Sequence, residues 1–506
     1  MGLKFYNTLR KKKEEFKPIE AGKASMYVCG ITAYDMCHIG HARSAVVFDV
    51  ICKYLKYKGY NVIYVKNFTD VDDKIIAKAN EEDTDIIEIS ERYIKEHNND
   101  MDGMGVARPS ITPKATENIK GMIRHISTLV EKGLAYVVEG NVFFAVDKFK
   151  GYGKLSGRNL DDMLAGARID INEKKKNPLD FILWKSAREG EPWWDSPWGR
   201  GRPGWHIECS VMSQRFLGET FDIHGGGMDL IFPHHENEIA QAEGATGKPF
   251  ANYWIHNGFV RINKEKMSKS LGNIFNLREA LGSYHPEVLR LFMLQSHYRS
   301  PVDFSDESLA EARTGMGRFY ETFKRTKDIL AAGIDFSDIL PKNLSGKDKD
   351  VFGKITTLPD RFAEAMDDDF NTARAIGYIF DATRLVNGYL AGKKFVPTAE
   401  SLFVLNSARD NVKKVGKVLG LFLEDPDEYF EKDKKREAEK QGLDIQEINA
   451  LIEERQKART AKKWKKADEI RNILAEKKVV LKDTADSTTW KIANLVKNQP
   501  LGIKKK

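Results

Sequence analysis

Residues that could bind a metal ion lie in three separate stretches of the chain. His234 and Glu238 stand four residues apart, and that spacing puts both side chains on one face of a helix. Cys29 closes an apolar stretch near the N-terminus, and Cys209 comes shortly before a second one. Two cysteines, one histidine and one glutamate would make a four-ligand zinc site. By composition alone, three other residues could also serve as ligands: Cys37, His235 and Glu236.

The cysteines by themselves leave this metal site undecided. The chain has only four cysteines in 506 residues, too few for a disulfide scaffold, and none forms a Cys-x-x-Cys pair. Cys29 and Cys209 could each be a small buried apolar residue rather than a ligand. A zinc site therefore requires that the fold bring these two thiols together.

A nucleotide could bind at His38-Ile39-Gly40-His41, which follows the first apolar stretch. Two imidazoles can donate hydrogen bonds to phosphate oxygens, and the glycine lets the backbone approach a base closely. The free N–H groups at the start of a helix would also favour phosphates. The motif fixes only three letters, so a chance match is a real alternative to a nucleotide site.

A second nucleotide motif is Lys266-Met267-Ser268-Lys269-Ser270. Its two lysines lie in a polar loop after an expected strand at 259–262. Lys269 could supply positive charge where pyrophosphate leaves the α-phosphate. A solvated charged turn is the alternative interpretation. The order of the two motifs, on either side of a split α/β domain, argues for a nucleotide site.

These motifs need a scaffold that positions them at one edge of a sheet. An apolar run at 26–29, helical spacing at 44–57 and a β-branched run at 61–65 predict strand, helix and strand. Such a unit implies a parallel sheet, where ligands bind at the carboxyl ends of the strands. Strand patterns return at 141–146 and 221–224, and helical patterns dominate beyond 305. We predict an α/β fold: a Rossmann-type doubly wound parallel sheet split by an insertion, followed by an α-helical bundle and a small C-terminal α+β domain.

The composition makes the chain mildly basic. There are 81 lysines and arginines against 74 acidic residues, which gives a formal net charge of +7. This balance fits an anionic partner such as nucleic acid, but only weakly. No stretch approaches the roughly 18 to 20 apolar residues that span a bilayer. Because the N-terminus also lacks a signal-peptide run, we expect a cytoplasmic protein with no membrane partner.

The two nucleotide motifs closely resemble the signatures of the class I aminoacyl-tRNA synthetases. Along nearly its whole length the chain is similar to the cysteinyl-tRNA synthetase family, in segments 26–32, 202–210, 224–227 and 232–238. The resemblance implies ATP-dependent activation of L-cysteine to cysteinyl-adenylate and its transfer to the 3′ end of tRNA(Cys). Residues that it implies for catalysis or ATP binding are His38, Gly40, His41, Lys266 and Lys269.

The resemblance also selects among the possible metal ligands. It implies one zinc ion per chain, held by Cys29, Cys209, His234 and Glu238, and ATP as substrate together with Mg²⁺. Zinc binds a thiolate far better than it binds a serine hydroxyl, so the metal would select the amino acid. The implied cysteine pocket consists of Gly30, Thr32, Trp205 and Asp229. A monomer is expected from the family alone.

We expect the chain to divide into the following domains. The catalytic domain would occupy 1–117 and 204–250, with a connective insertion at 118–203. A stem-contact region would follow at 251–310, a helical bundle at 311–425 and an anticodon-binding domain at 440–506. The last of these should present a basic face that follows a phosphate backbone: Arg455, Arg459, Lys462, Lys463, Lys465, Lys466 and Arg471.

Two tryptophans in the last domain receive different interpretations. Trp490 is a candidate for stacking on an unpaired base, with a core position as the alternative. Trp464 is expected on an apolar helix face with Ala467, Ile470 and Leu474.

Two rival functions also remain: a ligase that joins cysteine to an amino sugar, and a non-catalytic zinc protein that binds RNA. The C-terminal unit argues against the first, and the intact nucleotide motifs argue against the second.

Overall fold

A computed structural model of the chain describes residues 2–159, 175–266, 275–391, 395–483 and 488–492. The chain divides into two compact units. The first unit comprises Met1–Arg261, Ser296–Val302 and Phe362–Ala375. The second unit comprises Ile262–Gln295, Asp303–Arg361 and Ile376–Lys506.

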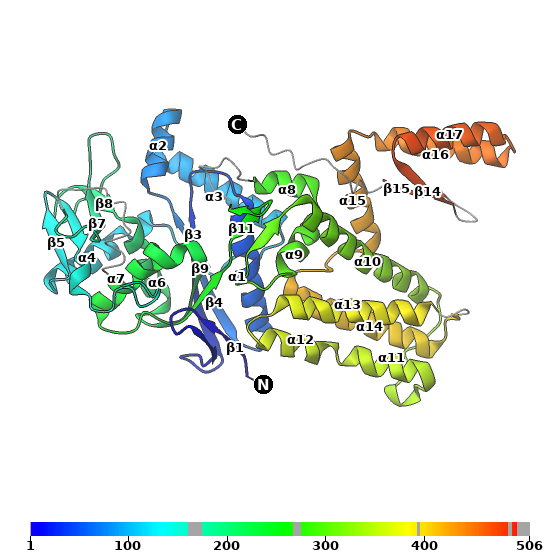
Figure 1. Cartoon of the computed structure of the whole chain (residues 1–506), viewed down its shortest axis with the longest axis horizontal. Coiled ribbons are helices and arrows are strands. Elements are labelled where there is room, and N and C mark those ends of the chain that lie inside the picture. The colour runs from blue at the N-terminus through cyan, green and yellow to red at the C-terminus, as the bar shows by residue number, and fades with distance from the viewer. Residues whose placement is uncertain (1, 160–174, 267–274, 392–394, 484–487, 493–506) are drawn as a thin grey trace. The chain divides into compact units, whose positions relative to one another are not determined.

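Four parallel strands form the central sheet of the first unit (Figure 1). Their order across the sheet is β10 (Ala251–Asn257), β9 (Phe221–Gly227), β3 (Lys23–Thr32) and β4 (Asn61–Thr69). The neighbouring residues Tyr27 and Val28 on β3 are both fully buried, so both faces of the sheet are covered. The strands predicted at 26–29, 61–65 and 221–224 are confirmed, and each is longer than predicted. The predicted α/β fold class is confirmed with them.

Helix α1 (Ile39–Tyr57) connects β3 to β4 and confirms the predicted βαβ unit. It begins five residues before the predicted start at 44. The reason is its N-cap: the side chain of His38 accepts hydrogen bonds from the backbone N–H groups of Gly40 and His41. The nucleotide motif therefore starts the helix instead of forming a separate loop.

The remaining strands and helices of the first unit surround this sheet. Among the described residues, a hairpin and five further helices, with four short helical turns, connect or flank the strands. They are β1 (Lys4–Asn7), β2 (Lys12–Glu15), α2 (Asp73–Glu82), α3 (Ile86–Gly103), α4 (Ile119–Glu131), α6 (Trp205–Leu217), α7 (Glu236–Thr246), and the turns Thr116–Asn118, Val146–Lys148, Met228–Leu230 and Ile231–His235.

An antiparallel sheet lies within the predicted insertion. Its order is β5 (Ala135–Val138), β6 (Asn141–Phe144), β7 (Phe181–Ser186) and β8 (Gly201–Pro203). Phe144 and Trp184 from this sheet are fully buried and belong to the same core cluster as Cys29 and Cys209. The insertion therefore shares one hydrophobic core with the catalytic sheet.

A late segment of the chain returns to the first unit through Asp369. This fully buried carboxylate accepts hydrogen bonds from the Tyr6 backbone N–H and the Tyr298 hydroxyl, both at 2.8 Å. It also pairs with Arg299 at 2.6 Å. These contacts attach the segment Phe362–Ala375 to β1.

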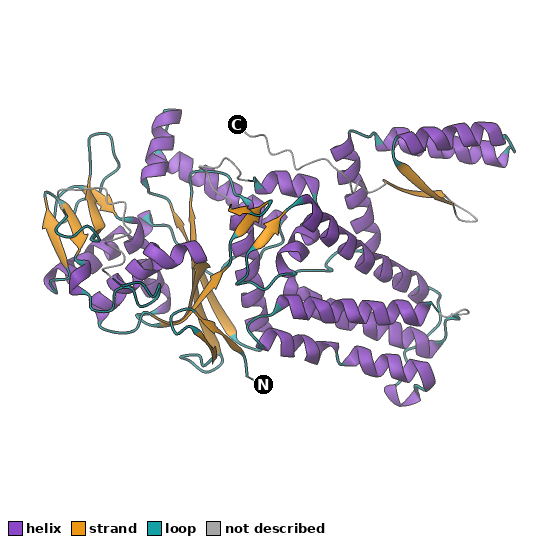
Figure 2. Cartoon of the chain, in the orientation of Figure 1, coloured by secondary structure: helices purple, strands orange, loops and turns teal. Residues whose placement is uncertain are grey.

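The rest of the chain is mostly helical, as the purple ribbons in Figure 2 show. Its elements are β11 (Val260–Ile262), β12 (Glu265–Lys266), α8 (Leu277–Ser283), α9 (Pro286–Leu294), β13 (Val302–Phe304), α10 (Asp306–Leu330), the turn Pro341–Asn343, α11 (Gly346–Thr356), α12 (Leu358–Asp367), α13 (Thr372–Leu390), α14 (Ala399–Leu419), α15 (Pro426–Gln441), α16 (Ile445–Thr460), α17 (Trp464–Glu476), β14 (Val479–Asp483) and β15 (Thr488–Ile492).

The last four elements form a small group around one apolar cluster. Ile448 and Ile452 from α16 meet Ile470 and Leu474 from α17, and the antiparallel pair β14–β15 adds Val479. The predicted pair of helices and pair of short strands are confirmed. Within the described residues, no helix is long and apolar enough to cross a membrane.

Candidate active site

Four buried side chains converge beside the carboxyl end of β3. Cys29 lies on β3, Cys209 on α6, His234 in the turn before α7 and Glu238 in the first turn of α7. One ligand atom from each residue lies within 4.8 Å of all the others. Cys29 Sγ is 3.7 Å from Cys209 Sγ and 3.3 Å from Glu238 Oε1, and His234 Nε2 is 3.0 Å from Glu238 Oε1. The structure thus brings all four predicted ligands together.

The local backbone explains why Cys29 can reach this site. The pairing of β3 with β4 shifts register between Val28 and Ile31, which is a β-bulge at Cys29 and Gly30. The backbone N–H of Gly30 donates to Asn67 Oδ1 at 2.8 Å. A Cβ atom at position 30 would lie 1.6 Å from the Asn67 carbonyl oxygen, so only glycine fits here.

The helix that carries Glu238 begins later than the sequence predicts. Pro233 was expected in the first turn of the helix, but α7 begins at Glu236. His234 lies in the π-helical turn Ile231–His235 just before it. The turn leads directly into α7, so the four-residue spacing still places His234 beside Glu238.

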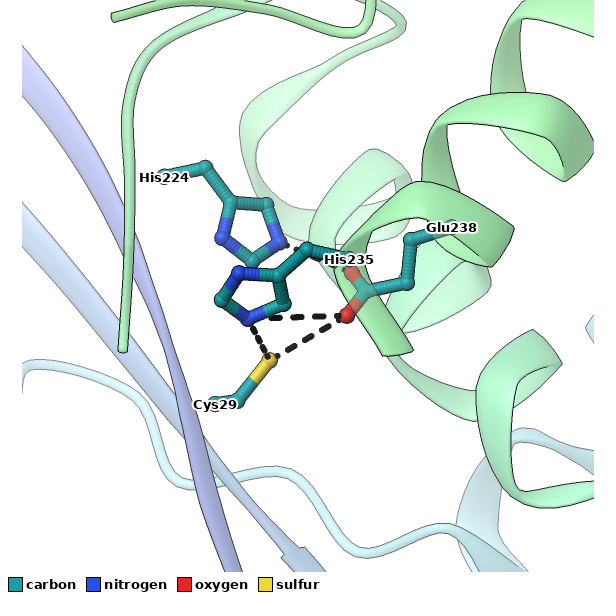
Figure 3. A group of neighbouring side chains, drawn as sticks. All are labelled: Cys29, His224, His235 and Glu238. Carbon is teal, nitrogen blue, oxygen red and sulfur yellow. Dashed lines mark hydrogen bonds and ion pairs between the residues drawn. The ribbon is translucent and has the colours of Figure 1, made fainter. Parts of the chain in front are cut away.

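A second group of possible ligands overlaps the first. Cys29, His224, His235 and Glu238 also have ligand atoms within 4.8 Å of one another. Figure 3 shows how these four side chains lie. His235 Nε2 is 3.3 Å from Cys29 Sγ, and His224 Nε2 is 2.8 Å from Glu238 Oε2. The two groups share Cys29 and Glu238, so they are overlapping candidates for the same ion.

The far side of the His224 ring distinguishes the two groups, because among the described residues His234 and His235 both have a partner at Nδ1 and His224 does not. A metal-bound histidine normally donates its other N–H to a partner. His234 Nδ1 has that partner, because His206 Nδ1 lies 2.8 Å away. His224 Nδ1 is buried and has no partner among the described residues. His224 therefore suits a role as an Nε2–H donor that orients Glu238, whereas His234 suits a role as a ligand.

The site demands positive charge. Burial acts to raise the pKa of Glu238, but His224 and His234 outweigh it and hold that pKa well below its ordinary value. Burial raises the pKa of the Cys29 thiol. Burial acts to lower the pKa of His234, yet the Glu238 carboxylate and the Cys209 thiol raise it to about 10. A buried carboxylate requires a compensating cation; the protonated His234 ring supplies it here, and a divalent metal ion bound in place of that proton could supply it instead.

Two of the four predicted cysteine-pocket residues adjoin these side chains, and the other two lie at the same edge of the sheet. Gly30 follows Cys29 directly, and its backbone is held by Asn67. The Trp205 ring stacks on His234 with 4.2 Å between ring centroids, and 40% of its surface remains exposed. Thr32 is the last residue of β3. Asp229 is exposed and lies two residues beyond β9, the strand next to β3, so it shares the same sheet edge.

The first nucleotide motif lies at this edge too. His38 and His41 follow β3 at the start of α1, and their rings stack with centroids 3.6 Å apart. His38 Nδ1 accepts from the Gly40 N–H at 3.1 Å and from the His41 N–H at 3.3 Å. A neutral His38 ring therefore carries its proton on Nε2, which can donate to an anionic ligand.

The second nucleotide motif is described only at its first residue. Lys266 ends strand β12, and Lys269 lies outside the described residues. The strand predicted at 259–262 before this loop is confirmed as β11.

The C-terminal basic face differs from the prediction in part. Arg455 is buried and pairs with Asp483 at 2.8 Å, and Arg459 pairs with the same carboxylate at 2.9 Å. Lys466 pairs with Glu454. These three cations are already neutralised, so they contribute less than predicted to a phosphate-binding surface.

Trp464 lies where the sequence did not predict it, and Trp490 takes the core position that was its alternative. Trp464 was predicted on an apolar face, but 60% of its surface is exposed because it is the first residue of α17. Trp490 packs against the apolar cluster, and its Nε1–H donates to Asn449 Oδ1 at 2.9 Å. The sequence spacing missed Trp464 because helical periodicity says little about a residue at the end of a helix.

Sequence reasoning also missed three histidines around the metal ligands. His206 contacts His234, His224 contacts Glu238, and His256 Nε2 lies 2.8 Å from His235 Nδ1. No short spacing joins these residues, so only the packing of α6, β9 and β10 reveals them.

Three family profiles match the sequence in chain order. Residues 15–314 match the tRNA synthetases class I (C) catalytic domain. Residues 361–424 match the DALR domain, and residues 445–490 match the cysteinyl-tRNA ligase anticodon binding domain.

Curated relatives match the chain almost from end to end. It is 55% identical over 496 residues to the cysteine–tRNA ligase of Geobacter metallireducens, covering 97% of this chain and 100% of that protein. It is 53% identical over 494 residues to the cysteine–tRNA ligase of Thermodesulfovibrio yellowstonii, covering 97% and 99%.

Solved structures share the fold at low sequence identity. Mycobacterium tuberculosis methionyl-tRNA synthetase bound by methionyl-adenylate matches with a TM-score of 0.58 and 14% identity, over 78% of this chain and 91% of that chain. A leucyl enzyme in ternary complex, LeuRS–tRNA–LeuAMS from Agrobacterium radiobacter K84, matches with a TM-score of 0.55 and 13% identity, over 80% and 86%.

Proposed function

The chain belongs to the cysteine–tRNA ligase family of class I aminoacyl-tRNA synthetases, and on that basis we propose that it recognises its amino acid through one zinc ion. As a member of this family it uses ATP to attach L-cysteine to tRNA(Cys). The proposed ligands are Cys29, Cys209, His234 and Glu238.

The hydrogen bond between His234 and His206 carries this proposal. It fixes the ring of His234 with Nε2 directed at Glu238 Oε1, 3.0 Å away. Two sulfurs, one imidazole nitrogen and one carboxylate oxygen are donors that tetrahedral zinc accepts. When bound there, zinc supplies a soft Lewis acid that prefers a thiolate to a hydroxyl.

This arrangement explains how cysteine could be separated from serine. A hydrophobic pocket rejects a close analogue by only about 100-fold. A donor atom that must join these four as a further ligand of the metal gives a larger difference in binding free energy. Trp205, stacked on His234, would cover the substrate side chain, and Asp229 would pair with its ammonium group. Gly30 and Thr32 would present backbone along the same edge.

The nucleotide would occupy the adjoining edge of the sheet. His38 and His41 would donate to the triphosphate, and Gly40 would allow close approach of the adenosine. Lys266 and Lys269 would stabilise the charge of the departing pyrophosphate, together with Mg²⁺. The substrate carboxylate is itself the nucleophile, so these residues act mainly by positioning and by charge stabilisation.

The C-terminal group would read the anticodon. Its match to an anticodon binding domain disfavours the amino-sugar ligase, the rival function that ends before such a unit. Trp464 is exposed beside Lys462, Lys463 and Lys465, a setting that suits stacking on an unpaired base. The proposal also includes the predicted domain boundaries. It further includes that the protein is a monomer and that it is located in the cytoplasm.

A single pair of assays tests the proposed function. Cysteine-dependent ATP–pyrophosphate exchange measures activation, and charging of purified tRNA measures transfer. We expect both reactions with cysteine and neither with serine. Exchange with serine at a comparable rate would exclude a metal–thiolate basis for recognition.

A further inference from the structure

A polar groove lies between helices α10 and α13 of the second unit. Its volume is about 300 Å³, and residues from both helices line it. The two helices approach closely here, because Gly315 lacks a side chain and Phe319 packs on Phe380 with ring centroids 4.3 Å apart. None of the predicted catalytic residues lines this groove.

Cations and buried hydroxyls dominate the lining of this groove. Arg318, Thr322 and Arg325 lie on one face of α10, at spacings of four and three residues. Thr383 and Asn387 face them from α13, and both threonines are less than 8% exposed. Arg384 and Glu321 complete the charged residues of the lining.

The charges of two arginines are not neutralised inside the protein. Among the described residues, neither Arg318 nor Arg325 has a carboxylate within 4.0 Å, although both are exposed. Arg384, by contrast, pairs with Asp381. Glu321 lies between the two arginines in sequence and forms no ion pair with either of them. The groove therefore keeps net positive charge where solvent can reach it.

The groove is also held in shape before any ligand arrives. Arg325 Nη2 donates to the Leu390 carbonyl oxygen at 2.7 Å, near the end of α13. Asn387 Nδ2 donates to Thr322 Oγ1 at 2.9 Å, which ties the two helices together across the floor. Thr322 Oγ1 in turn donates to the Arg318 carbonyl oxygen at 2.9 Å. A guanidinium fixed in this way loses less freedom when it binds an anion.

We infer that this groove binds one backbone phosphate of the tRNA, held between the guanidinium groups of Arg318 and Arg325. The inference rests on the function proposed above, because it is that function which supplies a polyanionic substrate. Seven residues separate the two arginines, about 10 Å along the helix, so both can reach a phosphate placed over Thr322. Arginine suits such a contact because its planar fork matches two phosphate oxygens.

The test compares the double variant Arg318→Gln/Arg325→Gln with a matched control. The control, Arg409→Gln/Lys413→Gln, removes the same charge from α14, outside the groove. Binding of tRNA is measured over a series of salt concentrations. We expect the groove variant to bind tRNA roughly tenfold more weakly, as for lost charge-assisted hydrogen bonds. Its salt dependence should flatten by about 0.7 to 0.9 in log–log slope, the contribution of one phosphate.

Further measurements distinguish a failure of this inference from a failure of the proposed function on which it rests. Cysteine-dependent pyrophosphate exchange needs no tRNA, so it should be unchanged in the groove variant. Absence of that exchange in the unaltered protein would refute the proposed function instead. Arg318→Gln alone provides a second variant that leaves the Arg325 contact with Leu390 intact, and Arg318→Lys/Arg325→Lys should restore the salt slope.

Three results would overturn the inference. One is binding of tRNA by the groove variant with the affinity and salt slope of the control. Another concerns the source of the phosphate: inorganic phosphate raises the melting temperature of the unaltered protein, the groove variant loses this effect, and tRNA binding is unaffected. That pattern would assign the groove to a free anion. Loss of binding to an acidic peptide, again with tRNA binding intact, would assign it to a protein partner.

Discussion

His206 and His234 face each other through their Nδ1 atoms at 2.8 Å, and only one of the two can carry the proton between them. If His234 binds a metal through Nε2, the proton must lie on its own Nδ1. His206 then accepts and must carry its own proton on Nε2. One hydrogen bond thus fixes the tautomers of two rings and the direction of a metal ligand.

Replacing His206 should therefore weaken the metal site without removing a ligand. We expect His206→Ala to lower zinc affinity by about 10- to 100-fold, the usual cost of losing such an outer partner. Competition with a chelator of known affinity measures this. His125→Ala, which removes a histidine bound to the Gln241 carbonyl oxygen, is the control. Equal zinc affinity in the two variants would show that His206 does not orient His234.

The metal content itself should be about one zinc per chain. Cys209→Ser should lower both zinc content and cysteine-dependent exchange, because a serine hydroxyl is a poor zinc ligand. Cys52→Ser, at a buried cysteine on α1, should leave both unchanged. Elemental analysis and exchange assays on the same preparations provide the measurement. Full activity in a preparation that lacks zinc would exclude the metal from cysteine recognition.

Lys269→Ala should slow adenylate formation by roughly 100- to 1,000-fold, as for the loss of one preorganised donor. The affinity for cysteine should change little, since the charge matters most as pyrophosphate departs. Pyrophosphate exchange at several cysteine concentrations separates the two effects. Lys264→Ala removes a nearby exposed lysine and serves as the control. A higher KM for cysteine with an unchanged turnover number would place Lys269 in ground-state binding.

Acid should destabilise the first unit through His97. Burial lowers the pKa of this histidine to about 3, and its ring contacts Cys37 and Phe68. Its pKa in the unfolded chain is near 6.5, so the unfolded chain binds more protons between those values and stability falls as the pH drops below about 6.5. Between pH 7 and pH 5 the free energy of unfolding should fall more in the unaltered protein than in the His97→Asn variant. The difference should be about 1.4 kcal/mol per pH unit below pH 6.5. Parallel losses in both proteins would show that other groups dominate.

Removing the C-terminal group should separate activation from charging. The structure locates a suitable cut after Gly442, because α15 runs to Gln441 and pairs with α10 through Arg313, Asp433 and Glu437. The shortened chain should keep pyrophosphate exchange and charge tRNA poorly. Within the full chain, Trp464→Ala should weaken tRNA binding more than Trp490→Phe, because only Trp464 is largely exposed. Unimpaired charging by the shortened chain would contradict an anticodon-reading role.

The sequence predicts the central strands well, and the four side chains that the resemblance selected do lie together in the structure, for identifiable reasons. Continuous apolar runs mark β3 and β4 because both faces of the sheet are buried. Resemblance selected four ligands that spacing alone left open. The histidines behind them could not be predicted, since His206 and His224 come into contact only through packing of α6 and β9. The start of α1 was misplaced because an imidazole, not a usual capping residue, accepts its first N–H groups.

Asn67 makes two contacts that together limit how this sequence can change. Its backbone oxygen excludes any side chain at Gly30, and its side-chain oxygen accepts from the Gly30 N–H and lies 3.7 Å from Cys209 Sγ. A mutation at position 30 would have to move a neighbouring strand, while a mutation at position 67 would disturb the Cys209 thiol, one of the proposed metal ligands. No single substitution at position 30 or 67 can therefore reshape this side of the pocket without one of these effects. A lineage, or a directed-evolution experiment, that sought a different amino acid would have to alter both positions at once or start from the opposite wall.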